Sequence, residues 1–226
     1  MEVTFSRVIG NVCKPIILWI VRGLALSRIH PNVLTFLGLV INIGAAWLLA
    51  VGQFRWAGAV IIGAGLFDMV DGRVARETNR VTRFGGFFDS VLDRYSDLGL
   101  LVGLLVWYGS INRFSYVVLT AAAMIGCVMV SYTRSRSENC IPSLCKVGFM
   151  ERPERVVLMI IGALSDRMPP VLWVIAVLAN LTVIHRMVFT WQEANKLEAE
   201  IRPAAQDTSG KAIRRAGISR ETSAGT

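Results

Sequence analysis

Long apolar stretches alternate with short polar connections along most of the chain. Six stretches are each long enough to cross roughly 30 Å of hydrocarbon as an α-helix. They cover about residues 33–52, 56–75, 86–109, 114–133, 153–171 and 172–191. The pattern predicts an all-α integral membrane protein with six transmembrane helices.

The two ends of the chain differ from this central block. Residues 1–30 contain an apolar run that basic residues interrupt. This arrangement favours an amphipathic helix in the membrane interface over a cleaved signal peptide. From residue 193 the sequence becomes polar and basic, which predicts a disordered cytoplasmic tail. The expected units are therefore an interfacial helix (1–30), a six-helix domain (31–192) and a tail (193–226).

Composition and charge agree with a membrane protein. Of the 226 residues, 54% are hydrophobic, and the mean hydropathy is +0.52, which is high for a soluble domain. Twenty Lys and Arg residues lie on one predicted side of the membrane, whereas only Arg55, Arg113 and Arg167 lie on the other. This bias predicts a multi-pass protein of the cell membrane with both termini in the cytoplasm. It also accounts for the net charge of +8 without a nucleic-acid partner.

Five aspartates interrupt the second and third apolar stretches near their predicted cytoplasmic ends: Asp68, Asp71, Asp89, Asp93 and Asp97. The first two are three residues apart and the next two are four apart, so each pair shares a helix face. A short connection makes the two helices antiparallel neighbours, and the four carboxylates then converge on one pocket. Buried carboxylates need compensating charge. One or two Mg²⁺ or Mn²⁺ ions, which prefer oxygen ligands, would supply it.

Small residues and an arginine lie among these aspartates. Gly72, Ala75 and Gly85 leave the helix surface bare, so a bulky ligand can approach the backbone. Arg76 presents a planar fork that suits a phosphate. Together with the carboxylates, these residues indicate a phosphoanhydride held by metal.

The residues form the pattern Asp68-x2-Asp71-Gly72-x2-Ala75-Arg76-x8-Gly85-x3-Asp89-x3-Asp93. At every specified position this pattern resembles the signature of the CDP-alcohol phosphotransferase family. The resemblance extends over roughly residues 10–192. It implies six transmembrane helices, a homodimer, and transfer of a phosphatidyl group from a CDP-linked membrane lipid to an alcohol, with release of CMP.

The resemblance also implies roles for individual residues. The four aspartates of the pattern would hold two divalent ions, Mg²⁺ or Mn²⁺, and Asp93 would take the proton from the incoming hydroxyl. The residues implied in binding the CDP-lipid are Asn32, Val33, Leu34, Thr35, Gly72, Ala75, Arg76, Thr82 and Gly85.

Arginines outside the signature indicate the acceptor alcohol. Arg134, Arg155 and Arg186 lie near the cytoplasmic ends of the fourth, fifth and sixth stretches, and we expect them to form a basic pocket for the phosphate of a phosphorylated acceptor. The run Glu151-Arg152-Pro153-Glu154-Arg155 resembles the inositol-phosphate branch of the family. That branch usually has lysine at the position of Arg134. The expected reaction joins CDP-diacylglycerol to inositol phosphate and gives phosphatidylinositol phosphate and CMP.

Other interpretations remain open at this point. Glycerol 3-phosphate would also suit a basic pocket, free inositol would need none, and the donor is either a diacyl or an archaetidyl lipid. Arg152 is expected to pair with Glu138 or Glu151, and Asp97 either orients its neighbours or pairs with an arginine. A divalent-cation transporter would also place carboxylates in a membrane. However, the other four stretches contain almost no acidic residues in their apolar cores.

Overall fold

The computed structural model describes residues 31–77, 82–142, 145 and 147–223, and the side chains of 32–68, 82–142, 145 and 147–199. These residues form six α-helices: α3 (Pro31–Ala50), α4 (Phe54–Glu77), α5 (Arg83–Ser110), α6 (Phe114–Cys140), α7 (Arg152–Leu164) and α8 (Met168–Ser223). The all-α prediction is confirmed for this part of the chain. The predicted N-terminal interfacial helix lies outside the described residues.

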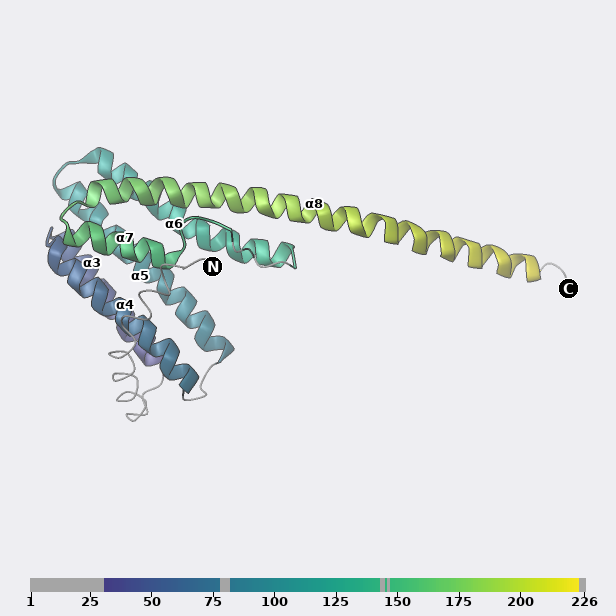
Figure 1. Cartoon of the computed structure of the whole chain (residues 1–226), viewed down its shortest axis with the longest axis horizontal. Coiled ribbons are helices and arrows are strands. Elements are labelled where there is room, and N and C mark those ends of the chain that lie inside the picture. Colours follow the sequence, from purple (N-terminus) through teal and green to yellow (C-terminus); the bar gives the residue numbers. More distant parts are fainter. Residues whose placement is uncertain (1–30, 78–81, 143–144, 146, 224–226) are drawn as a thin grey trace, which may run out of the picture.

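Short turns at 51–53, 111–113 and 165–167 connect α3 to α4, α5 to α6 and α7 to α8. Gly52, Asn112 and Asp166 take positive φ angles of 79°, 54° and 56° there, a region that Gly, Asn and Asp enter most easily. Helix α3 packs on α4 and α5, α4 packs on α7, and α6 packs on α5 and α8 (Figure 1). We call the end of the bundle that carries these turns the turn end and the opposite end the site end.

The largest apolar core lies at the turn end. Its buried side chains come mainly from the C-terminal halves of α3, α5 and α7 and the N-terminal halves of α4, α6 and α8, and they include Ala45, Leu49, Ile61, Leu104, Leu119, Met159 and Leu172. The outside of the bundle is also apolar, since Trp47, Ile125, Trp173 and Ile184 are each more than half exposed. Large exposed apolar surfaces are typical of a protein surrounded by lipid.

Three helices in the described part of the chain are long and apolar enough to cross a membrane: Asn32–Ala50, Phe114–Cys140 and Met168–Ala199. Helices α4 and α5 are longer than α3, but they carry the charged residues of the aspartate pattern. Helix α7 has only 13 residues, which corresponds to about 20 Å at 1.5 Å per residue. The six predicted spans are therefore present as helices, and three of them have the length and composition of a complete span.

Two predicted boundaries differ from the structure. The hydropathy pattern predicts that the fifth stretch continues to residue 171, but α7 ends at Leu164 and α8 begins at Met168, because a polar turn interrupts the apolar run. In addition, α8 stays helical to Ser223, where the composition predicts a disordered tail, and it extends well beyond the bundle (Figure 1). The segment after 193 is rich in Ala, Glu and Arg, which favour helix, and Lys196 pairs with Glu193 at 2.6 Å.

Gly103 of α5 lies against the backbone of α3. A Cβ atom at this position would come within 2.2 Å of the carbonyl oxygen of Ala46, so the helices would have to move apart. We expect Gly103→Ala to lower the free energy of unfolding by about 1–3 kcal/mol, measured as a lower melting temperature of the purified protein in detergent. Gly99→Ala is the matched control, because a Cβ there meets nothing within 4 Å. Equal melting temperatures for the two variants would contradict this packing.

Candidate active site

Carboxylates from two helices meet at the site end of the bundle. Asp68 on α4 and Asp93 on α5 both form ion pairs with the same nitrogen of Arg152, the first residue of α7. Arg152 Nη2 lies 2.6 Å from Asp68 Oδ2 and 2.9 Å from Asp93 Oδ1. One guanidinium therefore bridges α4 and α5, and the structure brings together two of the four aspartates of the sequence pattern.

The other two aspartates of the pattern lie on the same helices. Asp89 is partly buried one turn before Asp93 on α5. Asp71, Gly72, Ala75 and Arg76 lie in α4, but the structure describes only the backbone of these four residues.

Helix α3 leaves room for the carboxylate of Asp68. A Cβ atom on Gly38 would lie only 3.0 Å from Asp68 Oδ1. Glycine at this position therefore lets the α3 backbone approach the carboxylate closely. The sequence pattern did not include this contact.

The donor atoms of this cluster suit a hard divalent cation. The convergent groups are carboxylates, which are the ligands that Mg²⁺ and Mn²⁺ prefer. Among the described side chains, no group of three or more His, Cys, Asp or Glu is close enough to hold a metal ion, and the Arg152 guanidinium lies between Asp68 and Asp93. The chemistry of the residues thus fits a divalent ion, while a cationic side chain contacts the same oxygens.

The start of α5 gathers three of the residues predicted to bind the CDP-lipid. Thr82 is the N-cap of α5, and its Oγ1 accepts from the Gly85 backbone N–H at 2.9 Å. A Cβ atom on Gly85 would lie 3.4 Å from Asn32 Oδ1, so the beginnings of α3 and α5 are adjacent. The N-terminus of a helix favours an anion, because its N–H groups and dipole point outward.

The other residues of α3 that were predicted to bind the CDP-lipid, Val33, Leu34 and Thr35, differ from Asn32 in their surroundings. Val33 is 48% exposed, whereas Leu34 and Thr35 are buried. The buried pair therefore faces the interior of the bundle. Asn32 is the member of this segment that lies beside Gly85.

A cavity of about 190 Å³ adjoins the aspartates. Its wall includes Asp93 together with Arg134 of α6, Arg155 of α7 and Arg186 of α8. The three arginines predicted to bind the acceptor phosphate thus line one cavity with the predicted base. Residues from four helices meet there.

Arg186 and Arg134 already have hydrogen-bond or ion-pair partners within the protein. Arg186 is 2% exposed and donates to the carbonyl oxygens of Val130 and Val147 at 2.6 and 2.9 Å. Its third nitrogen lies 3.2 Å from Glu151 Oε1, and Arg134 Nη1 lies 3.4 Å from the same oxygen. These contacts hold the loop between α6 and α7 against α8.

Arg155 has unused hydrogen-bonding capacity. It is 5% exposed, and its Nη2 lies 2.5 Å from Asp97 Oδ2. Its Nε and Nη1 are buried and have no hydrogen-bond partner among the described residues. A buried donor without a partner costs about 1–3 kcal/mol, so a ligand that accepts from these two nitrogens would bind favourably.

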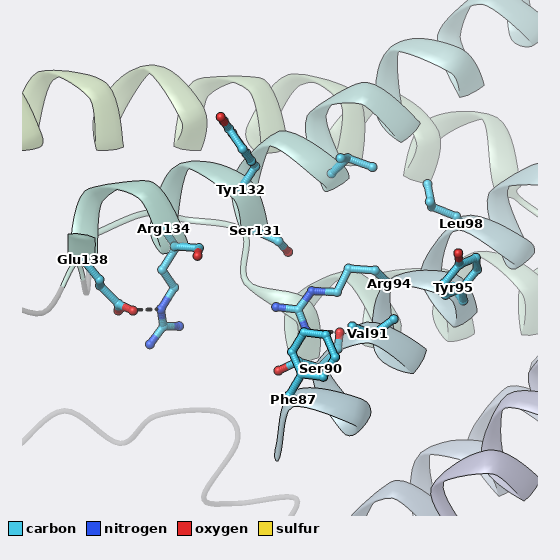
Figure 2. Close-up of a pocket in the computed structure, with 12 residues that line it drawn as sticks. Phe87, Ser90, Val91, Arg94, Tyr95, Leu98, Ser131, Tyr132, Arg134 and Glu138 are labelled. Atoms are coloured by element: carbon cyan, nitrogen blue, oxygen red, sulfur yellow. Dashed lines mark hydrogen bonds and ion pairs between the residues drawn. The ribbon is translucent and has the colours of Figure 1, made fainter. Parts of the chain in front are cut away.

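A larger, open cavity of about 850 Å³ lies between α5 and α6. Figure 2 shows Arg94, Tyr95 and Leu98 on one side of it and Arg134 on the other. Arg94, Ser131 and Arg134 line both cavities. The polar cavity therefore adjoins a wider groove that has apolar walls.

The comparison with known protein families decides the class of this site. A family described as CDP-alcohol phosphatidyltransferase matches residues 28–184, which is well over half of the chain. The chain belongs to this family of enzymes. This CDP-alcohol phosphatidyltransferase is also 34% identical over 166 residues to the archaetidylinositol phosphate synthase of Pyrococcus horikoshii, a match that covers 74% of this chain and 86% of that protein.

Two crystal structures of the phosphatidylinositol phosphate synthase of Mycobacterium tuberculosis are similar to this phosphatidyltransferase. The structure with CDP-DAG bound has a TM-score of 0.72 and 31% identity, and covers 78% of this chain and 94% of that one. The complex with manganese and citrate has a TM-score of 0.70 and 32% identity, with coverage of 76% and 87%. The protein is therefore a multi-pass membrane transferase of phospholipid biosynthesis. Its composition predicts the membrane location, and the resemblance to the family implies the activity.

Two residues of this phosphatidyltransferase have partners that the sequence left unassigned or assigned wrongly. The expectation that Arg152 pairs with Glu138 or Glu151 is wrong, since both glutamates bind Arg134 and Arg152 binds aspartates. Asp97 pairs with an arginine, which was one of its two expected roles. The sequence signal for Arg152 was its position at the start of α7, where its side chain reaches the ends of α4 and α5.

Proposed function

We propose that this enzyme transfers a phosphatidyl group from CDP-diacylglycerol to inositol phosphate, giving phosphatidylinositol phosphate and CMP. The observation that carries the acceptor assignment is the pair of buried Arg155 nitrogens without a partner among the described residues, in the wall of the cavity that contains Asp93. A phosphate oxygen accepts a strong, charge-assisted hydrogen bond from an arginine nitrogen, whereas a neutral polyol offers weaker acceptors. The names of the two relatives, both inositol phosphate lipid synthases, support the same acceptor.

For the donor, we infer that Asp68, Asp71, Asp89 and Asp93 hold two divalent ions, Mg²⁺ or Mn²⁺. When bound, such ions neutralise the pyrophosphate oxygens and the charge that develops on the leaving CMP. The convergence of Asp68 and Asp93 supports this assignment, as does the manganese complex of the relative.

The CDP-lipid would bind next to these carboxylates. Support comes from the adjacency of Asn32, Thr82 and Gly85 at the start of α5, where backbone N–H groups favour a phosphate. The further residues in this proposal are Val33, Leu34, Thr35, Gly72, Ala75 and Arg76.

In this proposal Asp93 acts as the general base. Its support is that Asp93 belongs both to the carboxylate cluster and to the wall of the acceptor cavity, and so lies between the two substrates. Asp93 takes the hydroxyl proton while the alcohol oxygen attacks the lipid-bearing phosphorus. The bond from this phosphorus to the bridging oxygen breaks, and CMP leaves with the electron pair.

We also propose that the protein forms a homodimer and that the six helices of each subunit are embedded in the membrane. Both termini and the site then lie on the cytoplasmic side. The distribution of Lys and Arg supports this orientation. The groove between α5 and α6 joins apolar side chains to Arg94 and Arg134. A lipid chain could remain in the bilayer there while its polar end reaches the site.

An acceptor screen tests the proposed function. Purified protein would receive CDP-diacylglycerol, Mg²⁺ and one acceptor: inositol phosphate, glycerol 3-phosphate or free inositol. We expect CMP release at low acceptor concentration to be at least about tenfold faster with inositol phosphate than with free inositol, because each 1.4 kcal/mol of phosphate binding corresponds to a factor of ten. Replacing the donor by a CDP-linked diether lipid tests the donor class in the same assay.

Reactions without acceptor and reactions with EDTA are the controls for this screen. CMP release with glycerol 3-phosphate but not with inositol phosphate would contradict the acceptor assignment. It would leave the family chemistry intact.

A further inference from the structure

Arg152 contacts the carboxylates that we propose as metal ligands. Its Nη2 donates to Asp68 Oδ2 at 2.6 Å and forms an ion pair with Asp93 Oδ1 at 2.9 Å. We infer that Arg152 is an internal counter-ion that competes with divalent cations for Asp68 and Asp93 and moves aside when they bind. This inference rests on the proposed function, because it takes the two carboxylates to be metal ligands.

The competition follows from the charges of the groups. Two carboxylates close to one another repel unless a positive charge lies between them, and Arg152 supplies that charge within hydrogen-bond distance of both. A divalent cation would supply a larger positive charge to the same oxygens, but it would also repel a guanidinium at that distance. Protein with Arg152 seated between the carboxylates is therefore not competent to bind the cation, which weakens the apparent metal affinity.

Asp97 offers Arg152 an alternative partner. Asp97 Oδ1 lies 3.7 Å from Arg152 Nε, and this Nε is buried without a hydrogen-bond partner among the described residues. Asp97 is outside the four proposed metal ligands and pairs with Arg155 through Oδ2, so its Oδ1 can still receive Arg152 when the cation binds. A small rotation of the side chain would move the guanidinium from Asp68 and Asp93 towards Asp97, within the wall of the acceptor cavity that Arg152 already lines.

The decisive measurement is the affinity for Mn²⁺ of the full-length protein in detergent without substrates, followed by the electron paramagnetic resonance signal of free Mn²⁺. Arg152→Gln removes the charge and keeps a polar side chain of moderate length. We expect it to bind Mn²⁺ about tenfold more tightly than wild type, because it removes a charge-assisted hydrogen bond to Asp68 and an ion pair with Asp93 that the cation must otherwise displace. Arg152→Lys keeps the charge on a shorter side chain without the planar guanidinium, so it should contact the two carboxylates less well and its affinity should lie between the two.

The matched control is Arg134→Gln. This variant also removes one positive charge from the cavity, but Arg134 pairs with Glu138 and Glu151, not with the proposed ligands. We expect its Mn²⁺ affinity to change by less than about threefold, as for an ordinary surface ion pair.

Melting temperatures give a second measurement on the same proteins. In EDTA, Arg152→Gln should melt below wild type, because two carboxylates lose their counter-charge. Saturating Mn²⁺ should raise its melting temperature more than that of wild type, since tighter binding to the folded state gives a larger stabilisation.

Equal or weaker Mn²⁺ binding by Arg152→Gln would overturn the competition, and so would equal or weaker binding by Arg152→Lys if the glutamine variant does not fold. Failure of the proposed metal site has a different signature. Wild type itself would then bind no Mn²⁺, and the competition would fall with the site.

Discussion

Asp93→Asn is expected to lower kcat by about 10³-fold while leaving most of the CDP-diacylglycerol binding intact. The amide cannot take a proton from the acceptor, and loss of a general base costs about 10²–10⁴-fold. The amide oxygen can still accept from Arg152, which lies 2.9 Å from the carboxylate in wild type, so the contact between α5 and α7 should persist. CMP release at saturating substrates gives kcat, and equilibrium binding of the labelled CDP-lipid gives the affinity.

Asp166→Asn is the control for this experiment. It makes the same chemical change in the turn between α7 and α8, at the other end of the bundle, and asparagine tolerates the φ of 56° that Asp166 adopts. Its kcat should equal that of wild type. Full activity of Asp93→Asn would show that another group removes the proton.

Arg155→Ala is expected to raise the KM for inositol phosphate by roughly 10²-fold, with little change in the KM for CDP-diacylglycerol. The estimate assumes the loss of one charge-assisted hydrogen bond to phosphate, worth up to about 3 kcal/mol. The measurement is initial CMP release over a range of acceptor concentrations at saturating CDP-lipid, and then the reverse.

Two further variants separate recognition of the acceptor from stability. Arg155→Ala also leaves Asp97 without its closest partner, which lies 2.5 Å away in wild type. Arg155→Lys retains a positive charge for Asp97 but not the planar fork, so it should recover stability more than acceptor affinity. Arg113→Ala, at the turn end, controls for loss of one arginine. An unchanged acceptor KM in Arg155→Ala would contradict the proposed phosphate site.

The helices and the meeting of Asp68 with Asp93 could be predicted from local information. Apolar stretches predict helices because each must satisfy its backbone groups within the membrane, and a short connection brings α4 and α5 together. Hydropathy predicted a break between α7 and α8 but placed it after residue 171, since only Ser165, Asp166 and Arg167 separate the two apolar runs. Composition likewise did not predict the helical course of residues 193–223.

The partners of the arginines could not be read from the sequence. Arg152 meets Asp68 across 84 residues, and Arg155 meets Asp97 across 58. Spacing rules apply within a helix, whereas these pairs depend on how α7 rotates about its axis when it packs against α4 and α8. The hydrogen bonds from Arg186 to two backbone carbonyl oxygens could not be predicted either, because one of them depends on the path of an irregular loop. A basic pocket was predictable, but not which arginine retains free donors.

The concentration of apolar packing at the turn end has a consequence for rigidity. At the turn end the helices are joined by close-packed side chains, whereas at the site end α4, α5 and α7 are joined by ion pairs that include Arg152 and Arg155. The side chains of these ion pairs are largely buried, so added salt screens them only weakly. Removing one of their charges, in contrast, leaves the partner buried and unpaired. We therefore expect the loss of a single charge to loosen the site end while the helices at the turn end stay packed.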